Sequence, residues 1–145
     1  MGFQKLESIH SGGIMYTEKI SVSTSSAEQM IDVTDKIQGI INKQRIEEGT
    51  VFLYVPHTTA AVTINESADP NVQSDIIASL HRLIPPDLDY RHFEGNSDAH
   101  IKSSLIGCNQ TILIKNKRLV LGTWQAIFFC EFDGPRNRNL IVRIQ

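Results

Sequence analysis

A strongly apolar stretch that ends in a dense polar cluster does most to limit the folds open to this 145-residue chain. Residues 119–138 read LVLGTWQAIFFCEFDGPRNR, and a run of this kind is typical of a buried β-strand. Its bulk is expected to come from Trp124, Ile127, Phe128, Phe129 and Phe132. Gln125, Glu131 and Asp133 interrupt the run with groups that are costly to bury without partners. We therefore predict a core strand whose polar residues meet partners from elsewhere in the chain.

A sharp turn is predicted where this strand ends, at Asp133-Gly134-Pro135. Arg136 and Arg138 follow the turn, and their planar guanidinium groups can hold a carboxylate or a phosphate. The same residues also fit a purely structural clamp, because turn carboxylates often accept backbone N–H bonds. The local pattern leaves both interpretations open.

Length and charge narrow the class of protein. The chain fits one domain over residues 1–145, long enough to bury about two thirds of its unfolded surface. The net charge of -2, with basic residues scattered along the chain, argues against binding nucleic acid or an anionic membrane. No run approaches the ~20 apolar residues of a membrane span, so we expect a cytoplasmic protein. Cys108 and Cys130 lie among apolar residues without a C-x-x-C spacing, which predicts buried free thiols.

The order of predicted elements indicates an α+β domain with a mostly antiparallel sheet and inserted helices. An opening hairpin is predicted from strands over 3–9 and 14–22 around Gly12-Gly13. Helices are predicted from a cap at Ser25 or Ser26 to Arg45, from 70 to 83, and over 100–105. Further strands are predicted over 50–55, 60–64, 111–114, 119–121 and 140–144. Residues 87–98 predict an exposed loop of a length that is often functional.

Two histidines, His57 and His100, lie where predicted elements meet loops. Together with Glu66 or Glu131 they would supply imidazole and carboxylate, the usual ligands of a catalytic divalent metal. No H-x-x-H or H-E-x-x-H spacing supports such a site. An isolated histidine is more often a hydrogen-bonded structural residue, so the metal site and the structural role are both kept.

A second group of polar residues suits an anionic ligand. Thr58 with Thr59, the run Lys102-Ser103-Ser104, and Arg136 with Arg138 offer donors for phosphate oxygens. The chain has neither a G-x-x-x-x-G-K-[ST] loop nor a G-x-G-x-x-G turn, which argues against nucleotide binding of the common kinds. It also lacks the G-x-S-x-G elbow of a serine hydrolase.

Three separate motifs, in order along the chain, resemble the YjbQ-like family, also called secondary thiamine-phosphate synthases. They are HTTAAVTINE at 57–66, DAHIKSSLIG at 98–107 and LGTWQAIFFCEFDGPR at 121–136. The resemblance implies an α+β domain on a β-sandwich-like sheet, assembled as a homotrimer with polar pockets near the subunit boundaries. It also implies a weak transferase activity, which joins thiazole phosphate to hydroxymethylpyrimidine diphosphate and releases pyrophosphate.

The resemblance carries the family's polar motif positions onto this chain. They are His57, Thr58, Glu66, Asp69, His100, Lys102, Ser103, Trp124, Gln125, Glu131, Asp133 and Arg136. The expected catalytic residues are His57, Glu66, His100, Glu131, Asp133 and Arg136. The expected phosphate-binding residues are Thr58, Lys102, Ser103, Gln125 and Arg136.

A divalent metal is the expected cofactor of this site. Arg136 and Lys102, with a bound Mg²⁺, would stabilise the departing pyrophosphate, and Glu66 or Asp133 would hold that ion. A zinc-like ion on His57, Glu66 and His100 is the alternative.

Two other kinds of protein fit the same residues. One is a non-enzymatic trimeric protein that binds a metabolite or metal without turnover. The other uses His57, Glu131, Asp133 and Arg136 as a hydrogen-bond network between subunits.

Overall fold

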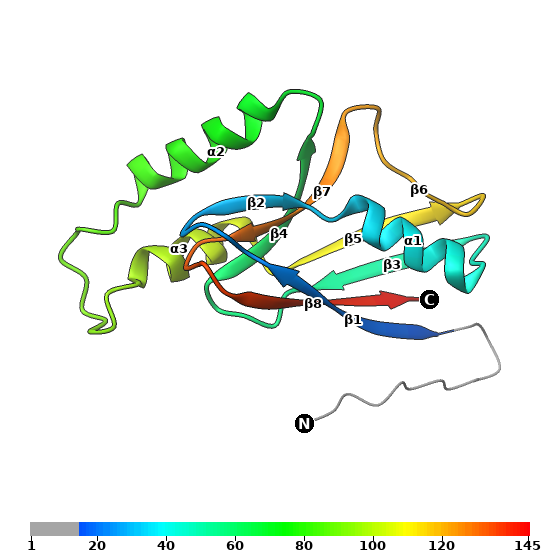
Figure 1. Ribbon diagram of the computed structural model, residues 1–145, viewed down its shortest axis with the longest axis horizontal. Coiled ribbons are helices and arrows are strands. Elements are labelled where there is room, and N and C mark those ends of the chain that lie inside the picture. Colours follow the sequence, from blue (N-terminus) through cyan, green and yellow to red (C-terminus); the bar gives the residue numbers. More distant parts are fainter. Residues whose placement is uncertain (1–14) are drawn as a thin grey trace.

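Two antiparallel sheets share one hydrophobic core in the computed structural model, which describes residues 15–145 (Figure 1). The larger, curled sheet has the order β1 (Tyr16–Ser23), β8 (Asn137–Ile144), β3 (Gly49–Tyr54), β5 (Asn109–Lys115) and β6 (Arg118–Leu119). The smaller sheet has the order β2 (Gln29–Asp32), β7 (Gln125–Glu131) and β4 (Ala60–Glu66). The helices are α1 (Thr34–Gln44), α2 (Pro70–Leu83) and α3 (Ser97–Ile106). The predicted α+β class and antiparallel pairing are confirmed, as a single domain with two sheets.

Strand β7 is the central strand of the smaller sheet and is buried on both faces. One face meets the larger sheet and α1, where Ile127 and Phe129 join the main core. The other face meets α3, where Phe128 packs in a second cluster with Ala99. A strand covered on both faces reads as a continuous apolar run rather than an alternating one. The predicted core strand is therefore confirmed, although Trp124 lies just before it and is 63% exposed.

The helix predicted from Ser25 or Ser26 to Arg45 is wrong in its first half. Residues Gln29–Asp32 form β2, which pairs with β7 from Gln29 opposite Glu131 onward, and the helix begins only at Thr34. Met30 and Val33 fit a helical spacing, but the open edge of β7 needs backbone partners, and a strand supplies them. Of the predicted opening hairpin, the strand over 14–22 corresponds to β1, and the strand over 3–9 lies outside the described residues.

The elements around the polar residues are longer than predicted. Helix α3 extends in both directions beyond the predicted 100–105, and β8 begins at Asn137 rather than at Leu140. Arg138, predicted to follow the turn, therefore lies on a strand of the larger sheet, with its side chain almost fully buried.

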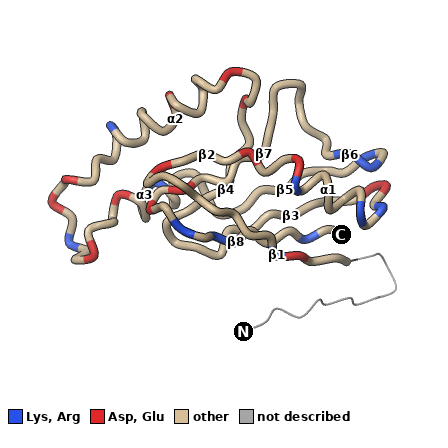
Figure 2. Tube along the Cα trace, in the orientation of Figure 1, with Lys and Arg blue, Asp and Glu red and all other residues tan. Residues whose placement is uncertain are grey.

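The predictions on charge distribution and on the two cysteines are confirmed in part. Figure 2 shows acidic and basic residues interspersed along the described trace. Both cysteines are free, as predicted, but Cys108 is exposed between α3 and β5 and only Cys130 is buried. Burial raises the pKa of the Cys130 thiol to about 12. Within residues 15–145, no helix is long and apolar enough to cross a membrane.

Candidate functional site

A polar pocket of about 350 Å³ opens where three segments meet. They are the residues that follow β3, the start of α3, and the turn between β7 and β8. Its lining residues are Pro56, His57, Thr58, Thr59, Glu94, Asn96, His100, Asp133, Arg136 and Arg138. They come from three separate parts of the sequence: residues 56–59, 94–100 and 133–138. The fold, and not a local motif, therefore builds the pocket.

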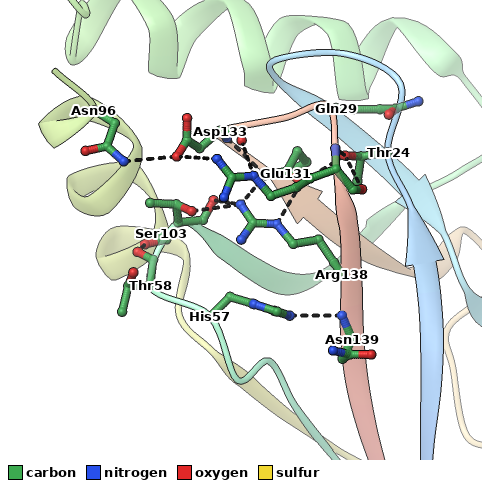
Figure 3. A network of polar contacts seen from close by, with 12 residues as sticks. Thr24, Gln29, His57, Thr58, Asn96, Ser103, Glu131, Asp133, Arg138 and Asn139 are labelled. Atoms are coloured by element: carbon green, nitrogen blue, oxygen red, sulfur yellow. Dashed lines mark hydrogen bonds and ion pairs between the residues drawn. The ribbon is translucent and has the colours of Figure 1, made fainter. Parts of the chain in front are cut away.

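The wall of the pocket rests on a buried ion pair between Glu131 on β7 and Arg138 on β8 (Figure 3). Arg138 Nε donates to Oε2 at 2.8 Å and Nη2 donates to Oε1 at 2.5 Å, a bidentate pairing of the strong kind. Nη2 also donates to Thr59 Oγ1 at 2.7 Å. Glu131 fixes the guanidinium plane, and Arg138 reaches the pocket surface in one orientation.

Glu131 accepts further hydrogen bonds that favour its charged form. Thr24 Oγ1 lies 2.9 Å from Oε2, and the Asp133 backbone N–H donates to Oε1 at 3.0 Å. Burial acts to raise the pKa of Glu131, but the hydrogen bonds from Arg138, Asp133 and Thr24 outweigh it, and the pKa lies below its ordinary value. Glu131 is therefore a carboxylate at neutral pH.

The turn after β7 is held against the loop between β1 and β2. Thr24 Oγ1 accepts from the Arg136 backbone N–H at 2.9 Å, and the Gly134 N–H donates to the Ala27 carbonyl at 3.0 Å. A Cβ at Gly134 would clash with the Ser26 carbonyl oxygen, so this close approach requires glycine. The tight turn sets the position of Arg136 relative to Arg138.

Arg136 is the more exposed of the two arginines, with half of its side chain open to solvent. Its Nε donates to the Asp133 carbonyl at 2.7 Å and its Nη2 to Asp133 Oδ2 at 3.0 Å. Asn96 Nδ2 donates to the same carboxylate oxygen at 3.0 Å, which joins the start of α3 to the turn (Figure 3). The structural clamp considered from sequence is present, and it orients a guanidinium group at the pocket.

His57 is held by a backbone hydrogen bond from β8. The Asn139 N–H donates to Nε2 at 2.9 Å, so the neutral ring carries its proton on Nδ1 (Figure 3). Burial lowers the pKa of His57, and the charge of Arg138 lowers it further. The imidazole is therefore neutral at pH 7 and has one N–H to donate.

Donors without partners distinguish this pocket from a closed structural network. Within residues 15–145, the Nη1 groups of Arg136 and Arg138 have no hydrogen-bond partner, and neither does His57 Nδ1. The carboxylates of Glu131 and Asp133 are already satisfied by arginines. Among the described residues the buried Oδ1 of Asn96 is an acceptor without a partner, but the two carboxylates do not compete for the free N–H donors, which are suited to receive the oxygens of an anion.

The structure gathers half of the ten predicted site residues into the pocket lining: His57, Thr58, His100, Asp133 and Arg136. Glu131 lies directly behind them. Glu66 and Gln125 pair with each other at the opposite end of β4 and β7. Seven strand residues separate that end from the pocket, a distance of about 20 Å.

Lys102 and Ser103 do not line the pocket. Lys102 is completely buried and pairs with Glu28, and its Nζ donates to Asp98 Oδ2 at 2.9 Å. Burial acts to lower the pKa of Lys102, but the hydrogen bonds to Glu28 and Asp98 raise it above its ordinary value. Ser103 Oγ donates to the Thr58 carbonyl at 2.5 Å and so fixes the backbone beside His57. Both residues attach α3 to its surroundings.

The predicted metal ligands do not form a group within one chain. Across residues 15–145, no three His, Cys, Asp or Glu side chains come together in a way that could hold a metal ion. His57 and His100 share the pocket, but Glu66 lies at the far end of β4. The Nε2 atom of His57 is also engaged by the Asn139 N–H. Within one chain, His57, Glu66 and His100 therefore do not fit a shared metal centre.

Thr24 and Asn96 belong to the site and its support but were not predicted. Thr59 and Arg138 were considered as donors to phosphate oxygens, without being among the expected catalytic or phosphate-binding residues. Arg138 had a signal, since it follows the turn and has the right side chain, but its burial beside Glu131 follows from strand pairing. Thr24 and Asn96 had none, because their roles depend on contacts with residues far along the chain.

These features define a class of protein: an α+β domain of two antiparallel sheets with an arginine- and histidine-lined polar pocket. The chain belongs to the YjbQ-like UPF0047 protein family, whose model matches residues 18–145. The UPF0047 protein MJ1081 of Methanocaldococcus jannaschii is 53% identical over 126 residues, covering 87% of this chain and 91% of that protein. YugU of Bacillus subtilis is 43% identical over 127 residues, covering 86% of this chain and 96% of that protein.

Solved structures show the same fold. The crystal structure of an uncharacterized conserved protein of this family from Clostridium acetobutylicum superposes with a TM-score of 0.86 at 47% identity. The match covers 88% of this chain and 99% of that one. A conserved hypothetical protein from Thermus thermophilus superposes with a TM-score of 0.83 at 40% identity, over 88% and 99% of the two chains.

Proposed function

We propose that this chain is a small transferase that joins thiazole phosphate to hydroxymethylpyrimidine diphosphate, forming thiamine phosphate and releasing pyrophosphate. The observation that carries the proposal is the convergence of Arg136, Arg138 and His57 on one pocket, each with an unpartnered N–H among the described residues. Such donors suit phosphate oxygens. The resemblance of the three sequence motifs supplies the particular substrates.

The proposed reaction asks the pocket to stabilise a leaving group. The bond between the pyrimidine methylene carbon and the diphosphate oxygen breaks, the thiazole nitrogen forms a new bond to that carbon, and pyrophosphate departs with the electron pair. Arg136 and Arg138 would bind the oxygens on which this charge develops, while His57 donates its Nδ1 proton as a hydrogen bond. Because Glu131 and Asp133 hold the guanidinium groups in place, little reorganisation is needed.

Purified protein incubated with both precursors, with and without Mg²⁺, tests the reaction through pyrophosphate release and thiamine phosphate formation. We expect slow turnover, and a His57→Ala variant at least about tenfold slower, because it loses a donor at the leaving group. His81→Ala is the matched control, since His81 contacts Glu28 and does not line the pocket. Saturable binding without product would instead identify a metabolite-binding protein. A protein that forms no product and binds neither precursor would reject both functions.

We also propose that the chain works as a homotrimer. Helix α2 lies on the outside of the domain (Figure 1). Leu80 packs against the second cluster, but no residue of the helix is fully buried. Leu83 is 72% exposed, and Trp124 and Leu113 are also largely exposed. Apolar surface of this kind on an amphipathic helix is suited to contact between copies of a chain.

Light scattering tests the assembly against the 16.3 kDa mass of one chain. We expect a particle of three chains, and a Leu83→Asp variant that dissociates, because a charge would be desolvated in an apolar contact. Ser74→Asp places the same charge at an exposed position on the opposite face of α2 and should leave the assembly intact. A wild-type monomer at all concentrations would disprove the trimer.

A further inference from the structure

A second cavity adjoins the polar pocket and differs from it in chemistry. This side groove, of about 360 Å³, is lined by Tyr90, His92, Ser97, His100 and Ile101. His100 lines both cavities and so forms a shared wall between them. The polar pocket offers guanidinium and imidazole donors, whereas the side groove offers aromatic rings and an aliphatic side chain.

The rings of the side groove are held in place. The Tyr90 hydroxyl donates to the Pro85 carbonyl at 2.9 Å, which fixes the far end of that side chain. The ring centroids of His92 and His100 are 5.4 Å apart, with an angle of 87° between the planes. This edge-to-face arrangement is one that aromatic rings favour. The groove is therefore lined by preformed rings together with Ile101, which is 40% exposed.

We propose that the side groove holds the planar ring of a ligand whose anionic group occupies the polar pocket. The ligand class is an aromatic or heteroaromatic phosphate, with His100 at the junction between its two parts. Flat rings pack well against Tyr90, His92 and Ile101, and the arginines take the phosphate oxygens. Each cavity has a volume suited to one such group. This inference rests on the anion-binding pocket of the proposed function and adds the site of the ring.

Calorimetry with phenyl phosphate and ethyl phosphate tests the groove, because both compounds carry the same anionic group. We expect phenyl phosphate to bind about tenfold more tightly, since only its ring reaches the apolar groove. Ile101→Asn should remove most of this difference in affinity between the two compounds. Leu105→Asn is the matched control, because Leu105 lies one turn further along α3, is 61% exposed and does not line either cavity. Tyr90→Leu removes a second wall and should reduce the margin independently.

The possible outcomes separate the ring site in the side groove from the anion-binding pocket on which it rests. Equal affinity for the two compounds, or a margin that survives both Ile101→Asn and Tyr90→Leu, would overturn the ring site and leave the anion pocket standing. No binding of either compound would overturn both. Binding with the expected margin, in a protein that does not convert the thiamine precursors, would support the ring site and reject only the proposed reaction.

Discussion

Replacing Glu131 with Gln is expected to lower the free energy of unfolding by about 3–5 kcal/mol, a large part of the total for a domain of this size. Glu131 is completely buried, and each of its oxygens accepts from two donors. A glutamine keeps one acceptor oxygen and turns an NH₂ group toward two of those donors. The buried Arg138 charge would also lose its counter-charge. Urea denaturation of the two proteins measures the difference.

Glu47→Gln is the matched control for this substitution. Glu47 pairs with Lys117 at 2.9 Å, but both side chains are more than half exposed. Breaking such a surface pair should cost less than about 1 kcal/mol. Equal losses in the two variants would show that the Glu131 pair gains nothing from its burial.

Acid titration provides a second measurement of the same carboxylate. The pKa of Glu131 is lower in the folded chain than in the unfolded chain, so the unfolded chain takes up the proton first as the pH falls. The stability that Glu131 contributes is therefore present above about pH 4.3, the ordinary pKa of glutamate, and is lost as the pH falls through the folded value. The Glu131→Gln variant should lack this part of the acid dependence.

Local patterns in the sequence predicted the elements that carry their own hydrophobic or capping signal. The apolar run of β7 predicted a buried core strand, and Asp69 followed by Pro70 predicted the start of α2, where the Asp69 side chain accepts from Asn71. The pattern failed over residues 29–32. Their helical spacing is real, but pairing with the edge of β7 decides their conformation.

The sequence predicted the residue types of the candidate site, but only some of the particular residues that line it. His57, His100 and Arg136 do lie around one pocket. Glu66 belongs to the same motif as His57, yet a strand carries it to the other end of the sheet. Lys102 and Arg138 were both considered as phosphate donors, but the lysine is neutralised by Glu28 and Asp98, and only the arginine reaches the pocket. Sequence spacing carries no information on which carboxylate meets which cation.

Replacing Arg136 with Met is expected to reduce turnover of the thiamine precursors about a hundredfold, the loss typical when a donor to developing negative charge is removed. Pyrophosphate binding should weaken by about 2 kcal/mol, or about thirtyfold. The fold should tolerate the change, because half of the Arg136 side chain is exposed and its ion pair with Asp133 lies at the surface. Steady-state kinetics and calorimetry with pyrophosphate measure the two effects, and urea denaturation checks the fold.

Arg143→Met separates a local effect from the loss of one positive charge. Arg143 is exposed on β8, the strand that also carries Arg138, but it does not line the pocket. If general electrostatic attraction governed pyrophosphate binding, the two variants would weaken it alike, and the deficit would disappear at high salt. A fixed guanidinium donor predicts a deficit confined to Arg136→Met that persists in salt. Wild-type affinity in Arg136→Met would remove Arg136 from the site, and the clamp with Asp133 and Asn96 would then be its whole role.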